Sequence, residues 1–188
     1  MFELLFANAA ALMAPDPGMK IYRALGDYGE SSVELFIDPA GEVLDCTVLY
    51  SDEPPSRSGR VCKRLVGMIF GNPAKDTVGD PVHGELTLSR VRRGAEIRIP
   101  SDFEVLVQRL PGNVERLRSE ILVLLDEEGR VRSCQPAEGS EPALAALACS
   151  QSEALGFPVR TGSDGHPVSY VTYLSADFVA QTNGAETE

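Results

Sequence analysis

In two stretches of the chain, an apolar run is followed by a short polar turn and a second β-prone segment, which in the first stretch alternates between apolar and polar residues. The segments concerned are 33–37 and 43–50 around Asp38-Pro-Ala-Gly41, and 121–125 and 131–135 around Asp126-Glu-Glu-Gly129. Apolar runs and a period of two are typical of β-strands. Asp accepts hydrogen bonds from the backbone that follows it, and Gly tolerates positive φ, so both turns favour tight reversals. Each stretch therefore predicts a β-hairpin.

A helical pattern and a long strand follow each hairpin. After Pro54 and Pro55 come apolar residues at helical spacing, namely Val61, Cys62, Leu65, Val66 and Ile69. In the second stretch Ser140 is a candidate N-cap for an Ala-rich helix. Segments 82–91 and 168–178 then predict closing strands, and 103–108 predicts a further strand. Each unit reads β-β-α-β, which indicates an α+β fold with a helix covering a small, mainly antiparallel sheet.

The two units are copies of each other in sequence. At a constant offset of 88 residues, four positions recur: Asp38, Gly41, Val43 and Cys46 become Asp126, Gly129, Val131 and Cys134. Further on, Cys62 corresponds to Cys149 and Phe70 to Phe157. Repetition at this scale predicts two tandem modules. We divide the chain into an apolar N-terminal segment (1–18), a first repeat (19–93), a linker (94–102), a second repeat (103–180) and a disordered polar tail (181–188).

The apolar start of the chain has two interpretations. Met1 to Ala14 ends in small residues before Pro15, as an export signal does, but it contains Glu3 and has no positive charge ahead of the apolar run. Alternatively, a short amphipathic helix docks on the protein through residues at helical spacing, namely Phe2, Leu5, Phe6, Ala9, Leu12 and Met13. The segment is too short to span a bilayer, which needs about 20 residues.

Charge narrows the class of partner. The chain has 188 residues, 43% of them hydrophobic, and a formal net charge of -11. Binding to nucleic acid or to an anionic membrane needs clustered Lys and Arg, and the sequence has no basic stripe. We therefore expect neither partner, and we expect no membrane span.

The four cysteines are distributed symmetrically between the repeats. In each repeat one cysteine lies on the second predicted strand and the other on the following helix, giving the pairs Cys46 with Cys62 and Cys134 with Cys149. A helix packed over the sheet would bring each pair together as a disulfide. Closing a loop of about 15 residues stabilises a fold by about 3 kcal/mol in the chain-entropy model. Four buried free thiols in a cytosolic protein are the alternative.

Zinc, redox and acid–base sites have weaker support. There is no CxxC or HxxxH spacing, and His83 and His166 occupy non-equivalent positions, so we expect no metal site. Redox-active thiols usually lie close together at a helix start, unlike these cysteines. Asp38 and Asp126 could form a symmetric acid pair, but their Asp-x-x-Gly context favours a role in turns. With no nucleophile–His–Asp pattern and no phosphate loop, we expect no catalytic residues and no cofactor.

The order of these motifs resembles the carboxy-terminal domain of TonB, the energy transducer of Gram-negative envelopes, and especially its cysteine-bearing versions. In the first repeat the matching residues are Ile37, Asp38, Gly41, Val43, Cys46, Cys62, Phe70, Pro73, Ala74, Gly79, Pro81 and Val82. In the second they are Asp126, Gly129, Val131, Cys134, Cys149, Phe157, Pro158, Gly165, Pro167 and Val168. Each motif alone marks only a turn or a core position, so the specificity comes from their order, found twice.

The resemblance implies an exported, periplasmic domain that binds an extended peptide by adding it to a sheet edge. The partner would be a protein or peptide of the cell envelope, an outer-membrane receptor being one candidate. Carried over to this chain, the binding edges would be the closing strands, at Val82, Gly84, Leu86, Leu88, Val168, Tyr170, Thr172 and Leu174. Alternatively, these edges are consumed by pairing the two repeats with each other.

The chain also departs from that family. It shows neither the membrane anchor nor the long Pro-rich spacer of a full transducer, so we expect an interaction module linked to outer-membrane transport rather than energy coupling by this chain alone. Two other functions stay open. One is a small periplasmic hydrolase or thiol enzyme that uses a cleft between the repeats, and the other is a purely structural envelope domain.

Overall fold

The computed structural model describes residues 2–5, 30–70, 74–76, 78–92 and 100–181. The first repeat contains β2 (Ser31–Ile37), β3 (Val43–Ser51), α2 (Pro55–Leu65), β4 (Ala74–Lys75) and β5 (Pro81–Arg92). The second contains β6 (Phe103–Val107), the 3-10 turn η2 (Pro111–Asn113), β7 (Arg116–Leu125), β8 (Val131–Pro136), α3 (Pro142–Ser152), β9 (Arg160–Thr161), β10 (Pro167–Val168) and β11 (Tyr170–Ala180). The α+β class is confirmed, with a mostly antiparallel sheet and two helices in the described part of the chain.

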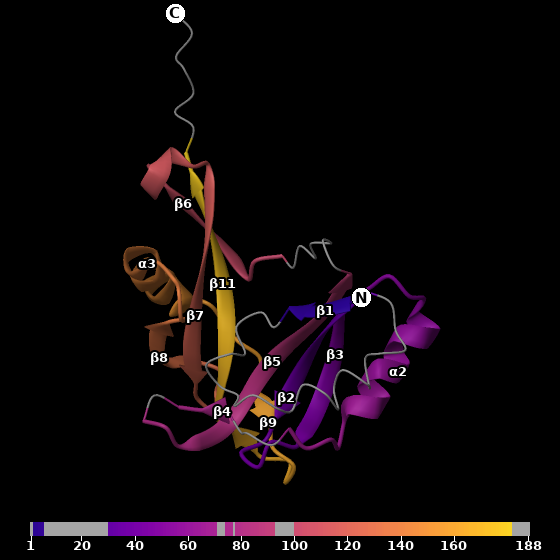
Figure 1. Ribbon diagram of the computed structural model, residues 1–188. Coiled ribbons are helices and arrows are strands. Elements are labelled where there is room, and N and C mark those ends of the chain that lie inside the picture. The colour runs from indigo at the N-terminus through magenta and orange to yellow at the C-terminus, as the bar shows by residue number, and fades with distance from the viewer. Residues whose placement is uncertain (1, 6–29, 71–73, 77, 93–99, 182–188) are drawn as a thin grey trace, which may run out of the picture.

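The repeats share one sheet whose strand order is a palindrome. The order is β3-β2-β5-β11-β7-β8, so each hairpin lies at an outer side and the two closing strands meet in the middle (Figure 1). There β11 pairs with β5 in parallel at two residue pairs, Tyr170 with His83 and Val171 with Gly84. Equivalent strands that run in parallel are related by a rotation about an axis along the strands. That rotation turns the sheet over from one repeat to the next.

As a result, the two helices cover opposite faces of the sheet. Val61 and Leu65 of α2 pack on the odd-numbered residues of β2, whereas Leu144 and Ala148 of α3 pack on the odd-numbered residues of β7. β11 contributes to both cores, because Val171 belongs to the first and Tyr170 to the second. The two hydrophobic cores therefore lie on either side of a shared sheet.

The hairpin turns use their Asp residues as the sequence predicts. The Oδ1 atom of Asp38 accepts hydrogen bonds from the N–H groups of Ala40 (2.9 Å) and Glu42 (2.8 Å). Asp126 accepts in the same way from Glu128 (3.0 Å) and Arg130 (2.9 Å). Gly41 and Gly129 have φ of 84° and 75°, a region that favours glycine. Both carboxylates thus serve as turn acceptors.

The helix of the first repeat is shorter than its apolar spacing suggests. It ends at Leu65, and Val66 and Ile69 are 47% and 70% exposed. Gly67, with φ of 80°, turns the backbone back toward the first residues of β3, where its N–H donates to the carbonyl of Val43. Backbone pairing with β3 has replaced the last helical turn.

The chain start forms a strand where it is described. β1 (Phe2–Leu5) pairs antiparallel with residues 89–92 of β5, which corrects the helical prediction for these four residues. The end of β5 supplies unpaired N–H and C=O groups, and backbone pairing there outweighs the helical spacing. The other residues of the predicted docking helix or signal remnant, 1 and 6–18, lie outside the described ranges. So do 94–99 of the linker and 182–188 of the tail. Within the described ranges, no helix has the length and apolar character needed to cross a membrane.

Candidate functional site

A cleft opens in the middle of the sheet, where β5 and β11 diverge. The parallel pairing of β11 with β5 ends at Val171, and its pairing with β6 begins only at Ala176. On the other side, β5 pairs with β1 from Ser89 onward. Segments 85–88 and 172–175 therefore face the gap with no partner strand among the described residues, and Figure 1 shows the two strands spreading apart.

The cleft encloses about 670 Å³ and draws its walls from both repeats. One wall is the face of the first repeat that α2 leaves open, with Glu34, Leu49, Glu85 and Thr87. The other contains β11, part of β7, the segment before β6 and the segment that follows α3. Binding pockets commonly have volumes of about 300 to 1,000 Å³, so this cleft is large enough for a short peptide segment.

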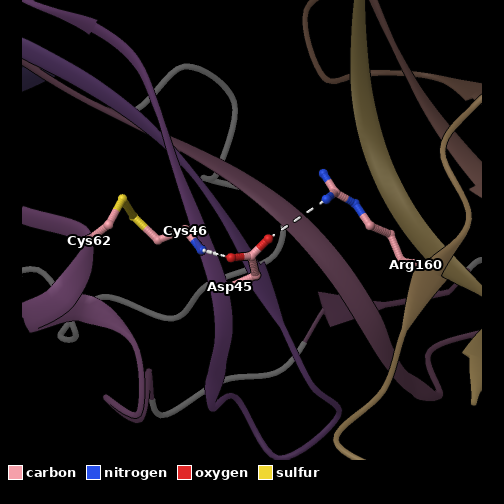
Figure 2. Close-up of a disulfide and its surroundings, with 4 residues drawn as sticks. All are labelled: Asp45, Cys46, Cys62 and Arg160. Carbon is pink, nitrogen blue, oxygen red and sulfur yellow. Dashed lines mark hydrogen bonds and ion pairs between the residues drawn. A yellow bond between two sulfur atoms is a disulfide. The ribbon is translucent and has the colours of Figure 1, made fainter. Parts of the chain in front are cut away.

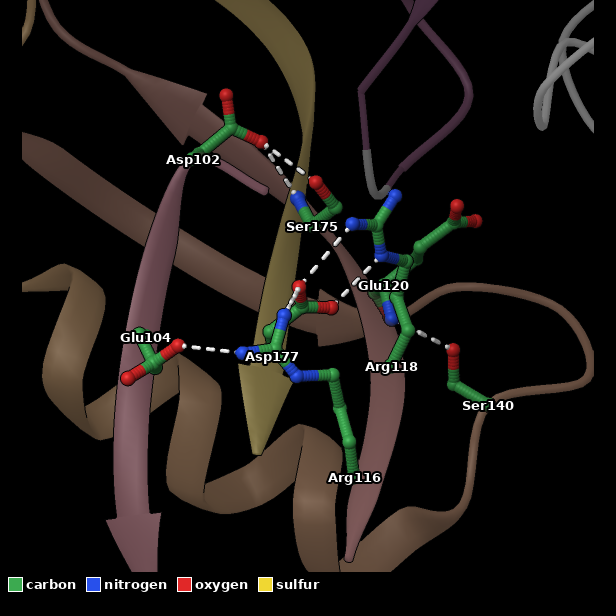
Figure 3. Close-up of polar contacts among 8 residues, drawn as sticks. All are labelled: Asp102, Glu104, Arg116, Arg118, Glu120, Ser140, Ser175 and Asp177. Carbon is green, nitrogen blue, oxygen red and sulfur yellow. Dashed lines mark hydrogen bonds and ion pairs between the residues drawn. The ribbon is translucent and has the colours of Figure 1, made fainter. Parts of the chain in front are cut away.

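On the cleft side of β11, the backbone of Tyr173 has no partner strand among the described residues. The carbonyl of Ser175 accepts from the N–H of Asp102 (2.9 Å), and the Asp102 carboxylate accepts from the N–H (2.7 Å) and the hydroxyl (3.1 Å) of Ser175 (Figure 3). Because backbone groups point to the same side of a strand at every second residue, Tyr173 directs its N–H and C=O toward this side as well. The Tyr173 carbonyl accepts a long hydrogen bond (3.4 Å) from the hydroxyl of the neighbouring Thr172.

Arg160 joins the second repeat to the open face of the first. Its guanidinium donates to Glu34 (2.8 Å) and Glu85 (2.6 Å) and lies 5.6 Å from the centre of the Phe36 ring. A fourth contact, 3.9 Å long, reaches Asp45 beside the Cys46–Cys62 disulfide (Figure 2). Burial and the nearby Glu85 charge raise the pKa of Glu34, against the opposing effect of Arg160. Burial alone would lower the pKa of Arg160, but the charges of Glu85 and Glu34 raise it overall.

A second charged group lies at the other end of the cleft. Asp177, 4% exposed, accepts from Arg118 (2.8 and 3.2 Å) and from Arg116 (3.1 Å), as Figure 3 shows. Hydrogen bonding to Arg118 holds the pKa of Asp177 below its usual value. Arg116 also pairs with Glu104 on β6 (3.0 Å), so this group ties β6, β7 and β11 together.

Glu120 differs from the other acidic residues of the cleft. Its backbone is held by Ser140, whose hydroxyl accepts from the Glu120 N–H (3.1 Å) and donates to its carbonyl (2.8 Å). Its carboxylate, in contrast, makes no hydrogen bond to a described residue. Burial raises the pKa of Glu120, the Arg118 charge opposes this, and the Asp102 charge adds to it. Burial and the Glu120 charge also raise the pKa of Tyr173.

The predicted disulfides are present. Cys46 is bonded to Cys62 and Cys134 to Cys149, with Cα–Cα distances of 5.1 and 5.7 Å, and no cysteine is free. Each bond links the second strand of a repeat to its covering helix. Two disulfides are consistent with an oxidising, exported compartment.

The predicted binding strands occupy other positions than outer edges. Leu86 and Leu88 are 4% and 1% exposed and pair with β2, Val82 pairs with β4, and Val168 pairs with β9. Gly84 pairs with Val171 of β11. Because the repeats meet through these strands, a peptide cannot pair along their full length. Four of the eight predicted residues line the cleft: Leu86, Tyr170, Thr172 and Leu174.

The charged residues of the cleft could not be identified from the sequence, and Arg160, Asp102 and Glu120 are the clearest examples. They come from different elements, and the cleft exists only because the repeats share a sheet. A lone Arg after the second helix of an acidic chain is too weak a signal to assign. In the described part of the chain, no three His, Cys, Asp or Glu side chains lie close enough together to hold a metal ion.

Comparison of the chain with protein-family models, with curated proteins and with solved structures finds no match.

Proposed function

We propose that this chain is a non-enzymatic, periplasmic, TonB-like interaction module that takes an extended peptide of an envelope partner into the cleft between β5 and β11. The peptide would add as a short strand to the exposed backbone of β11. The observation that carries this proposal is the backbone of Tyr173, which faces the cleft without a partner strand among the described residues. Strand addition uses such unpaired N–H and C=O groups for affinity and neighbouring side-chain pockets for selectivity.

The outer strands of the sheet are less suited to strand addition. At the start of β3, the N–H of Val43 donates to the carbonyl of Met68, and the carbonyl of Gly41 accepts from Phe70. The Asp45 carboxylate then accepts the N–H of Cys46 at 2.8 Å (Figure 2). At the opposite side of the sheet, β8 is six residues long and ends at a proline. Blocked or short edges of this kind discourage strand addition.

The chemistry of the cleft favours binding over catalysis. The hydroxyl of Ser175 contacts the Asp102 carboxylate, but the triad pattern also needs an imidazole between a Ser and an Asp. His83 stacks on Phe36 with ring centres 5.6 Å apart and is not among the residues that line the cleft. All four cysteines are in disulfides, which leaves no thiol for a thiol enzyme.

Selection from an unbiased peptide library tests the proposal. Peptides displayed on phage would be selected on the immobilised, disulfide-intact protein, and binders would be compared on two variants. Thr87→Trp fills the cleft, whereas Thr47→Trp places the same ring outside it. Both threonines pair with Glu34, from opposite sides of β2, so the variants are closely matched.

We expect a group of peptides whose affinity falls at least about tenfold with Thr87→Trp and less than about twofold with Thr47→Trp, measured by fluorescence anisotropy. On binding these peptides, the amide of Tyr173 should become protected from hydrogen exchange. If every selected peptide tolerates Thr87→Trp, the cleft is not a peptide site and the proposal is wrong.

A further inference from the structure

Three carboxylates from different elements share the space of the cleft. Glu34 lies on β2, Asp102 lies just before β6, and Glu120 lies on β7. Burial is the main cause of the raised pKa of Glu34 and of Glu120, and the charge of Asp102 adds a smaller increase to both, so Asp102 acts electrostatically on residues of both walls. With Glu85, four carboxylates and two guanidinium groups line the cleft.

The two guanidinium groups already have partners. Arg160 is held by Glu34 and Glu85, and Arg118 is held by Asp177, which is not among the lining residues. Asp102 accepts from Ser175, and the Glu120 carboxylate makes no hydrogen bond to a described residue. The excess negative charge therefore concentrates around Asp102 and Glu120, beside the exposed backbone of Tyr173. A partly desolvated cleft of one charge sign favours a ligand of the opposite sign.

The spacing of these carboxylates favours an organic cation over a metal ion. In the described residues no three acidic side chains approach closely enough to share a metal ion. A Lys or Arg side chain reaches further, since its charged group sits on a flexible stem and carries several N–H donors. The lining also includes the aromatic residues Phe157 and Tyr173, and aromatic rings attract such cations.

We propose that the peptide bound in the cleft carries a Lys or Arg side chain that pairs with Glu120 and Asp102. The backbone of that peptide would pair with Tyr173, and the cation would provide the selectivity. This inference rests on the proposed function, because it assigns the side-chain chemistry of the same peptide.

Cleft-dependent peptides from the phage selection provide the first test. We expect Lys or Arg at one fixed position in these peptides, well above its frequency in the unselected library. A set of cleft-dependent peptides with no basic position would overturn the inference and leave the proposed function standing. If no selected peptide depends on the cleft, both are wrong.

A double-mutant cycle provides the second test. One synthetic cleft-dependent peptide is compared with its analogue in which the basic residue is norleucine. On the wild-type protein this change should weaken binding about tenfold, and on Glu120→Gln less than about threefold, because the charged partner is gone. Glu127→Gln, an exposed change of the same charge outside the cleft, should retain the tenfold difference. An unchanged tenfold difference on both Glu120→Gln and Asp102→Asn would overturn the pairing.

Discussion

One pair of equivalent positions separates the two repeats most clearly. In the first repeat Ala74 of β4 lies against Gly84, and in the second the matching residues are Arg160 of β9 and Tyr170 of β11. A Cβ added at Gly84 would lie 2.5 Å from that of Ala74 and 3.3 Å from Val171, so small residues let β4 and β11 approach β5 closely. Arg160 and Tyr170 in the second repeat are large and do not permit such a close approach. Arg160 extends instead to the open face of the first repeat.

The two repeats are therefore unequal partners in the shared sheet. Both repeats contain the same type of hairpin turn and a disulfide that links the second strand to the helix. The parts that differ lie where the modules meet: a close approach at Gly84, a cation at Arg160 and the cleft between them. Shared features maintain the fold, and unequal features create the site.

The largest loss of stability is expected from removing a disulfide, and removing each one in turn tests whether the two stabilise the fold equally. Replacing Cys46 and Cys62 by alanine, or Cys134 and Cys149, should lower the free energy of unfolding by about 3 kcal/mol in either case, because the loops are of nearly equal length. Urea denaturation of the two double variants measures this. A difference above about 2 kcal/mol would show that helix packing, and not loop entropy, sets the loss.

The next largest loss of stability is expected from removing Arg160, the cation that the second repeat contributes to the cleft. Arg160→Met should cost about 2.5 kcal/mol at neutral pH, because Glu34 and Glu85 are left partly buried and unpaired. The pKa of Glu34 is raised above its ordinary value of 4.5, so its contribution to stability is most favourable below that pH and declines as pH rises through the folded pKa. Removing Arg160 raises this pKa further, so the penalty should shrink at about pH 4.

A matched control for Arg160→Met is Arg57→Met. Arg57, in the first turn of α2, pairs with Glu53, which lies just before the helix, and its side chain is 59% exposed. Its removal should cost less than about 0.5 kcal/mol, with no marked pH dependence. A penalty for Arg160→Met that does not change between about pH 4 and pH 7 would contradict the role of the two carboxylates.

Gly84→Ala tests the close approach in the first repeat. We expect a loss of about 2 kcal/mol, because the new methyl group meets the Cβ of Ala74, which is 2% exposed. Gly59→Ala is the control, since a Cβ there meets nothing within 4 Å and alanine favours the helix. If Gly84→Ala is as stable as the wild type, β4 can shift without cost, and the asymmetry between the repeats has no structural basis at this position.

The parts of the fold that could be predicted from the sequence are those fixed by neighbours in the chain. Asp38 and Asp126 bind backbone groups within four residues, and each disulfide closes a loop inside one repeat. Local periodicity and spacing contain enough information for both. The predicted length of α2 was wrong because a contact distant in sequence sets its end. The N–H of Gly67 donates to the carbonyl of Val43 in β3 and does not continue the helix.

The charged residues of the site could not be predicted, because only contacts between the repeats bring them together. β11 is buried on both faces, with Tyr170 in one core and Val171 in the other, and the sequence shows only a β-prone run. Nothing local indicates that equivalent strands pair in parallel and place the helices on opposite faces. Pairing between the repeats and a cleft between them were alternatives that the sequence left open, but the positions of Arg160 and Glu120 follow from the parallel pairing and were missed.

The smallest expected effect concerns the two hairpin turns. Hydrogen bonds from the backbone and side chain of Arg130 lower the pKa of Asp126, so its charge stabilises the fold above pH 3.8 and this contribution is lost as pH falls through the folded pKa. Asp126→Asn keeps the Oδ1 acceptor but loses the ion pair, so its melting temperature should be slightly below that of the wild type at pH 6, and the difference should shrink as pH falls below 3.8. In the first repeat, Glu42 occupies the position equivalent to Arg130, so Asp38 has no ion pair at this position. Asp38→Asn should therefore change the melting temperature less than Asp126→Asn. Equal shifts for both variants would mean that the turn geometry alone, without Arg130, determines the role of these aspartates.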